Sequence, residues 1–126
     1  MSFSTSVKKP TKQSYIYQAT IVAIPNQSLA INTLANKHSS VKIKKVYLSF
    51  PPATYYELEV YFTIGNSALT GIIKRIPEND SLLGDNESYE IPVNESVNPL
   101  TGFWINVKNN STTNTHTVNV IVYGEE

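Results

Sequence analysis

The residues able to do acid–base chemistry are few in this chain. It has two histidines, His38 and His116, and two aspartates, Asp80 and Asp85, which lie close together in the sequence. Serines are plentiful, but none stands in the G-x-S-x-G turn that exposes a nucleophile. The absence of cysteine excludes thiol nucleophiles and zinc–cysteine sites. We therefore expect a protein that is not an enzyme and has no catalytic residues.

Carboxylates gather at two places. The stretch PENDSLLGDNES, residues 77–88, offers oxygen ligands of the kind that Ca²⁺ takes, from Glu78, Asp80, Asp85, Asn86 and Glu87. Their spacing does not match the EF-hand pattern, so a solvated loop is preferred and calcium stays an alternative. Glu57 and Glu59 share one side of a predicted strand, which marks an exposed or interfacial face rather than a glycosidase pair. We expect no metal site and no cofactor.

Lysines cluster in two short segments, VKKPTK at residues 7–12 and KIKK at residues 42–45. Neither alternates with aromatic residues, so neither offers a stacking platform for nucleic acid, and a phosphate contact is the lesser alternative to a solvated flank. Residues 1–56 contain seven lysines and no acid, whereas all ten acids follow. This asymmetry fits an anionic partner or head-to-tail pairing, but a sandwich that interleaves both halves would mix the charges, and we prefer that interpretation.

Three aromatic residues, Tyr55, Tyr61 and Trp104, are expected to point away from the core, because each alternates with apolar positions. Exposed rings of this kind can stack on sugar rings. They can equally cover a second layer or a neighbouring subunit. The sequence leaves both interpretations open.

The elements that position these residues are predicted to be strands. Residues 55–64, YYELEVYFTI, alternate strictly, with Tyr56, Leu58, Val60, Phe62 and Ile64 on one face. Residues 41–50 change phase at Lys44 and Lys45, which predicts a β-bulge. Further strands are predicted at residues 14–24, 28–34, 69–76, 89–93, 103–107 and 116–123. For residues 30–37 a single helical turn remains the alternative.

Prolines and polar turns predict where pairing ends. Pro92 predicts that residues 89–93 form a short edge strand, after a polar loop at residues 78–88. The chain closes on GFWINVKNNSTTNTHTVNVIVYGEE, residues 102–126, which reads as a hairpin with one apolar face and one face of Asn, Thr and Lys. Its last strand lacks proline, so we expect that strand to be free to pair with a neighbour.

The pattern as a whole predicts an all-β protein, an antiparallel β-sandwich of about seven to eight strands of jelly-roll or Greek-key type. Its 126 residues suffice for one domain. We expect a basic N-terminal arm at residues 1–13 and a single sandwich at residues 14–126. No apolar run is long enough to span a bilayer, and the N-terminal residues lack the apolar core of a signal peptide.

The basic Ser/Thr/Lys arm, the compact strands, the lack of cysteine and catalytic residues, and the Asn/Thr-rich turns together resemble small jelly-roll structural proteins of virus particles. The resemblance implies a minor capsid, vertex, decoration or tail subunit, made in the host cytoplasm and located in the virion. Its partners would be copies of itself and other structural subunits.

The same resemblance assigns an assembly role to arm residues Phe3, Val7, Lys8, Lys9 and Lys12. The lysines are expected to meet acids between Glu78 and Glu95 of a neighbour. The alternative function is a carbohydrate-binding or host-attachment sandwich, in which Tyr55, Tyr61 or Trp104 contacts a glycan.

Overall fold

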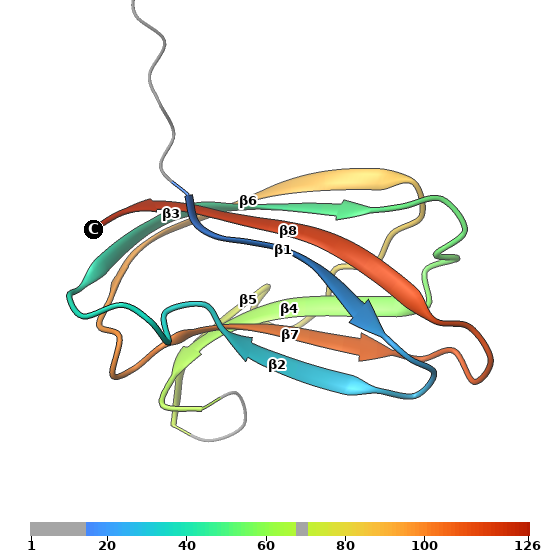
Figure 1. The fold of residues 1–126 in the computed structure, drawn as a ribbon, viewed down its shortest axis with the longest axis horizontal. Coiled ribbons are helices and arrows are strands. Elements are labelled where there is room, and N and C mark those ends of the chain that lie inside the picture. Colours follow the sequence, from blue (N-terminus) through green and yellow to red (C-terminus); the bar gives the residue numbers. More distant parts are fainter. Residues whose placement is uncertain (1–14, 68–70) are drawn as a thin grey trace, which may run out of the picture.

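The computed structural model describes residues 15–67 and 71–126, which form eight antiparallel strands in two packed sheets (Figure 1). The strands are β1 (Tyr15–Ala23), β2 (Ser28–Asn32), β3 (Val41–Phe50), β4 (Leu58–Gly65), β5 (Ile72–Ile76), β6 (Glu87–Val97), β7 (Phe103–Asn109) and β8 (His116–Glu125). The described residues include no helix long and apolar enough to cross a membrane. The predicted all-β sandwich is confirmed. The arm predicted at residues 1–13 lies outside the described residues.

The strand order is that of a jelly roll. One sheet has the order β1-β8-β3-β6 and the other β2-β7-β4-β5, so the chain passes from sheet to sheet at every connection except the one between β4 and β5. Figure 1 shows the two sheets lying face to face. Eight antiparallel strands with such long-range neighbours form the double Greek key.

The core lies between the sheets and is built from alternate residues of both. Phe62 of β4 and Phe103 of β7 stack with ring centroids 5.8 Å apart, and both are fully buried. From the facing sheet, Val118, Val120 and Val122 of β8 are fully buried as well. Burial of each such side chain stabilises the fold by about 1.5–3 kcal/mol.

The predicted terminal hairpin is wrong. β7 and β8 belong to different sheets, and the residues between them carry the chain from one sheet to the other (Figure 1). β8 pairs with β1 along one side and with β3 along the other, so its backbone is not free to pair with a neighbour. Alternation correctly places the apolar faces of both strands on one core, but it carries no information about which strand pairs with which.

The strand predicted at residues 55–64 begins later, at Leu58. Tyr55 and Tyr56 have positive φ values of 55° and 57° and are exposed. Their left-handed backbone interrupts the alternation, and the Glu57 N–H donates to the Thr54 carbonyl at 3.0 Å to close the turn. Tyr56 therefore does not enter the core as its place in the pattern suggested.

Other local predictions are confirmed in position, with changed lengths. The register of β3 against both neighbours shifts between Ile43 and Lys45, which is the predicted bulge. β6 is an edge strand, but it extends over Glu87–Val97, because Pro92 on an edge does not end pairing. Residues 28–32 are a strand followed by a turn at residues 33–36, so the helical alternative for residues 30–37 is wrong. β5 starts after Gly71, and residues 69 and 70 lie outside the described part.

The charges of the two halves of the sequence meet in space. Lys44 pairs with Glu125 at 2.7 Å and Lys45 pairs with Glu90 at 3.2 Å, so lysines of the basic half contact acids of the acidic half. The expected interleaving is thereby observed in β3 and its neighbours. Such exposed pairs contribute only about 0–1 kcal/mol each.

Candidate functional site: a groove on the outer face of one sheet

The outer face of the sheet β2-β7-β4-β5 carries polar side chains of several kinds. Strand register sets them in rows: Asn32, Trp104 and Thr63; Ala30, Asn106 and Tyr61; Ser28, Lys108 and Glu59. These residues alternate with the core residues of the same strands, so they point away from the other sheet. The rows bring together side chains that lie far apart in the sequence.

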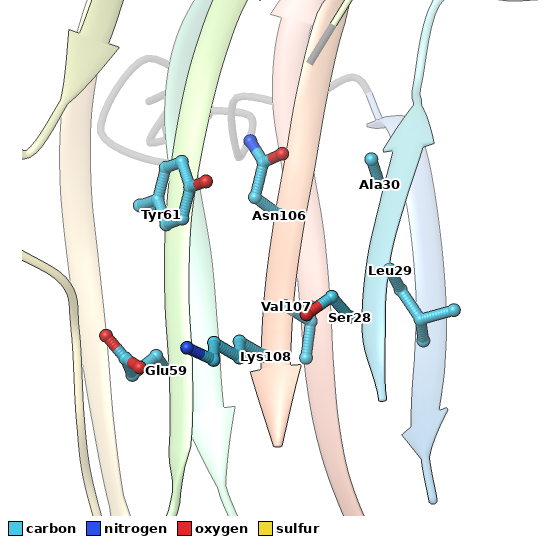
Figure 2. Close-up of a pocket in the computed structure, with 8 residues that line it drawn as sticks. All are labelled: Ser28, Leu29, Ala30, Glu59, Tyr61, Asn106, Val107 and Lys108. Carbon is cyan, nitrogen blue, oxygen red and sulfur yellow. The ribbon is translucent and has the colours of Figure 1, made fainter. Parts of the chain in front are cut away.

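Two of these rows enclose a depression of about 260 Å³, which we call the outer groove. It is lined by Ser28, Leu29, Ala30, Glu59, Tyr61, Asn106, Val107 and Lys108 (Figure 2). The depression forms because the side chains on β2, Ser28 and Ala30, are small, whereas those on β4, Glu59 and Tyr61, are large.

Tyr61 is held in place by an anchored arginine. The guanidinium of Arg75 lies 4.1 Å from the centre of the Tyr61 ring, a cation–π contact between β5 and β4. Arg75 donates to the carbonyl of Pro77 at 2.6 Å, to the carbonyl of Asp80 and to the Ser81 hydroxyl at 3.3 Å. The loop after β5 therefore fixes the arginine, and the arginine fixes the ring.

Asn106 lies in the middle of the face and is only 5% exposed. Its Nδ2 donates to the hydroxyl of the fully buried Thr63 at 3.1 Å. Figure 2 shows the amide standing above β7, with its nitrogen on the side of β4 and its oxygen on the side of β2. A buried amide is costly unless it is hydrogen-bonded, so its orientation is strongly determined.

One end of the outer groove carries opposite charges. Glu59 accepts a hydrogen bond from the Asn110 side chain at 2.7 Å, which orients the carboxylate. Lys108 is opposite Glu59 in the register and is exposed, and within the described residues its ammonium has no ion-pair partner. The two charges sum to zero.

The three aromatic residues expected to point away from the core occupy different places in the structure. Tyr61 lines the outer groove. Trp104 is on the same sheet face but donates from Nε1 to the Gly65 carbonyl at 2.9 Å and lies over Gly102, where a Cβ would approach Nε1 to 2.9 Å. Tyr55 is 62% exposed in the turn before β4 and does not line the groove. The prediction missed Asn106 and Lys108, although both belong to the polar face noted for the terminal segment.

The acid–base residues do not converge. His38 is exposed, Asp80 accepts from the Ser81 N–H at 2.8 Å, and Asp85 accepts from the Thr54 N–H at 3.2 Å. Over residues 15–67 and 71–126, no three His, Asp or Glu side chains gather as a metal site requires. The acids of the loop at residues 78–88 are thus divided among separate contacts.

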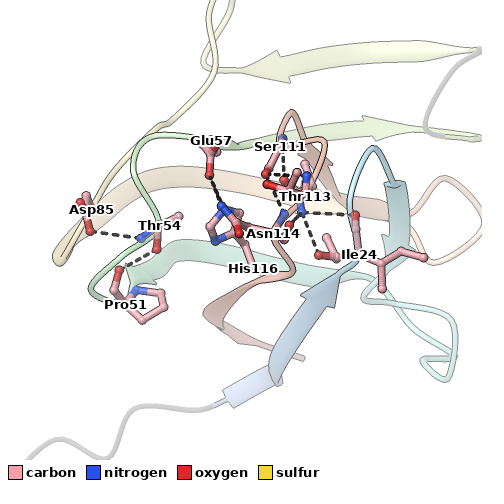
Figure 3. Close-up of polar contacts among 11 residues, drawn as sticks. Ile24, Pro51, Thr54, Glu57, Asp85, Ser111, Thr113, Asn114 and His116 are labelled. Atoms are coloured by element: carbon pink, nitrogen blue, oxygen red, sulfur yellow. Dashed lines mark hydrogen bonds and ion pairs between the residues drawn. The ribbon is translucent and has the colours of Figure 1, made fainter.

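His116 instead joins a polar cluster at one end of the sandwich (Figure 3). Its Nε2 lies 2.8 Å from Oε1 of Glu57. This hydrogen bond is the main cause that lowers the pKa of Glu57 below its ordinary value, and desolvation opposes it. Nearby, Asn109 Nδ2 contacts the carbonyls of Ala23 at 2.9 Å and Asn114 at 2.8 Å. These contacts fix the connection between β7 and β8.

No protein-family model matches this chain, and no curated protein matches it significantly. Among solved structures, the chain is similar to the crystal structure of the Yersinia pseudotuberculosis-derived mitogen, with 16% sequence identity and a TM-score of 0.45. The alignment covers 89% of this chain and 86% of that one. A likeness of this size says nothing about function.

Proposed function

We propose that this chain is a non-enzymatic structural subunit of a virus particle and that it works as an oligomer with itself or with other structural subunits. The observation that carries the proposal is the jelly-roll order, β1-β8-β3-β6 packed on β2-β7-β4-β5. Viral shell proteins use this architecture, as do lectin domains. Because one fold serves many functions, the surfaces of the domain must supply the rest of the argument.

An apolar flank beside β5 supports contact between subunits. We use this name for Ile72, Ile73 and Leu100, of which Ile73 is 74% and Leu100 is 89% exposed. Ile73 lines a groove of about 410 Å³ together with Asn98 and Thr101, and Leu100 lies in the turn between those two residues. Exposed large apolar side chains that gather in one place are typical of interaction surfaces.

The flank also includes a sheet edge. β5 is five residues long and lies at the edge of its sheet, and Lys74 crosses from it to Glu95 of β6 at 2.6 Å. A second subunit placed here would bury the isoleucines and could pair with the edge. We therefore propose β5, in place of the terminal strand, as the edge used in assembly.

The N-terminal arm keeps its proposed role as a connector to a neighbour. It precedes Tyr15, the first residue of edge strand β1, so it joins the domain at the margin of a sheet. Among the acids proposed to meet its lysines, Glu78 and Asp80 are exposed and have no ion-pair partner within the described residues. Ion pairs alone would add about 0–1 kcal/mol each, so Phe3 and Val7 must add apolar contact.

Sedimentation velocity over a range of concentrations tests the proposal. We expect the full chain to form oligomers and Ile73→Asp to weaken their association at least about tenfold, which corresponds to about 1.4 kcal/mol. Val22→Asp is the matched control, because Val22 is an exposed apolar residue on β1, away from the flank. Deletion of residues 2–13 should leave a folded domain that assembles poorly.

The virion assignment needs a second measurement. An antibody against the chain should label particles purified from the cells that make it. A full chain that stays monomeric at its highest soluble concentration and is absent from such particles would contradict the proposal. Equal assembly of the full and truncated chains would remove the role of the arm alone.

A further inference from the structure

The outer groove contains an amide oxygen, Oδ1 of Asn106, that no described residue hydrogen-bonds. One N–H of the Asn106 Nδ2 group donates to the Thr63 hydroxyl, whereas no described residue donates to Oδ1 of Asn106. Fully enclosed side-chain polar atoms without a partner do not occur in the described part of the chain, so this oxygen is open to the groove. A carbonyl oxygen in so buried a residue requires a donor from water or from a ligand.

The Tyr61 ring, which lines one side of the groove, is already fixed in place before a ligand binds. Arg75 stacks on Tyr61, and the contacts of Arg75 to the loop after β5 keep the pair in place. No described residue hydrogen-bonds to the Tyr61 hydroxyl, which can both donate and accept. A ring that is already fixed binds a ligand without the cost of ordering it.

The two opposite charges of the groove give it no net preference for an anion or a cation. Glu59 would repel an anion and Lys108 would repel a cation, and the two are opposite each other on β4 and β7. Both can hydrogen-bond to neutral hydroxyl groups, the carboxylate as acceptor and the ammonium as donor. The lining therefore fits a neutral ligand that carries several hydroxyls.

The position and the volume of the groove further restrict the class of ligand that it can bind. The groove lies over β7, which is paired with β2 and β4 on its two sides, so a peptide bound there would find no free backbone groups on that strand. Its volume of about 260 Å³ is below the roughly 300–1,000 Å³ of pockets for drug-sized ligands. One six-membered ring fits, and an attached chain can continue over the open face.

We propose that the outer groove binds a neutral sugar ring. A ring hydroxyl donates to Asn106 Oδ1, a C–H face packs against Tyr61, and neighbouring hydroxyls bond to Glu59 and Lys108. This binding does not depend on assembly through the apolar flank, since the groove and the flank share no lining residue. In a particle subunit it would supply attachment to a glycan-coated surface.

Titration with methyl glycosides of glucose, galactose, mannose and N-acetylglucosamine, followed in ¹⁵N–¹H spectra, tests the proposal on the full chain. We expect at least one glycoside to shift the Asn106 side-chain amide and the backbone amides of Ala30 and Lys108. Tyr61→Ala should weaken that binding about three- to tenfold. Tyr55→Ala, which removes an exposed tyrosine outside the groove, should leave it unchanged.

A second pair of variants consists of one substitution that blocks the groove without removing an internal contact and one control substitution. Ala30→Trp fills the space beside Asn106 and should abolish binding, whereas Gln18→Trp adds the same ring at an exposed position of β1 and should not. Circular dichroism must show that each variant is folded. The proposal is overturned if none of the four glycosides shifts these resonances, if the shifts map elsewhere, or if Ala30→Trp binds like the original chain.

Discussion

His116 Nε2 and Glu57 Oε1 lie 2.8 Å apart and join the start of β8 in one sheet to the turn before β4 in the other. The imidazole is buried, with only 6% of the side chain exposed, whereas the carboxylate remains one-third exposed. The hydrogen bond from His116 favours the ionised form of Glu57 and lowers its pKa. Folding and ionisation of this carboxyl are therefore linked.

The sign of that linkage predicts acid sensitivity. Because the pKa of Glu57 is lowered on folding from an ordinary value of 4.5, its stabilising effect is present above that value and is lost as pH falls through the lowered pKa. Glu57→Gln should be less stable than the original chain near neutral pH, and the difference should shrink on acidification. Thermal unfolding from about pH 7 to about pH 3 measures it.

The control for this experiment is Glu78→Gln, which changes an exposed carboxyl without an ion-pair partner in the described part of the chain. Its midpoint should follow that of the original chain. If the melting temperature of Glu57→Gln differs from that of the original chain by the same amount at all pH values, ionisation of Glu57 does not contribute to stability; if the two curves coincide, the contact itself contributes nothing.

Asn109 should be one of the most sensitive polar positions. It is buried, its Nδ2 contacts the carbonyls of Ala23, Ile24 and Asn114, and its Oδ1 accepts from the Ser111 N–H at 2.9 Å. Asn109→Ala leaves these groups without a partner and should lower the free energy of unfolding by about 2–4 kcal/mol in denaturant titration. Asn110→Ala, which loses one exposed bond to Glu59, should cost about 1 kcal/mol or less.

Trp104 should prove to be structural. Trp104→Phe removes the 2.9 Å bond to the Gly65 carbonyl and should lower the free energy of unfolding by about 1 kcal/mol. Glycoside binding should stay as in the original chain, because Trp104 does not line the outer groove. Lost binding in a variant that melts like the original would place Trp104 in the site.

Proline substitution distinguishes interior from edge strands. Ile121 of β8 is paired on both sides, with Gln18 and with Tyr47, so Ile121→Pro should prevent folding. Glu90→Pro is the matched control on β6, because Glu90 is two residues from Pro92 and shares its hydrogen-bonding direction on an edge strand. Circular dichroism should show an unfolded chain in the first case and a sandwich in the second.

Local sequence patterns were sufficient to predict the positions of most strands. The alternation from Leu58 to Ile64 and the phase change at Lys44 reappear as β4 and as the register shift in β3. These features follow from side chains within one strand. The pairing of β8 with β1 and β3 does not, because several strands have equivalent apolar faces and only their joint packing selects the neighbours.

The candidate site was predictable in part. The pattern placed Tyr61 on the outer face, but it also placed Tyr55 there, since alternation does not reveal a positive φ. The groove depends on the small Ala30 lying opposite Asn106, a relationship between β2 and β7 that requires the register. Only the polar alternation of Asn106 and Lys108 was visible beforehand.

The position of the last two strands sets when this protein can fold during its synthesis. Without β7 and β8, β1 and β2 have no strand neighbour, and only the pairs β3–β6 and β4–β5 remain. Those are isolated two-stranded ribbons, which are at best marginally stable in water. Strands β7 and β8 must therefore emerge from the ribosome before either sheet closes, and until then the apolar faces of the six earlier strands remain open to chaperones or to a neighbouring nascent chain.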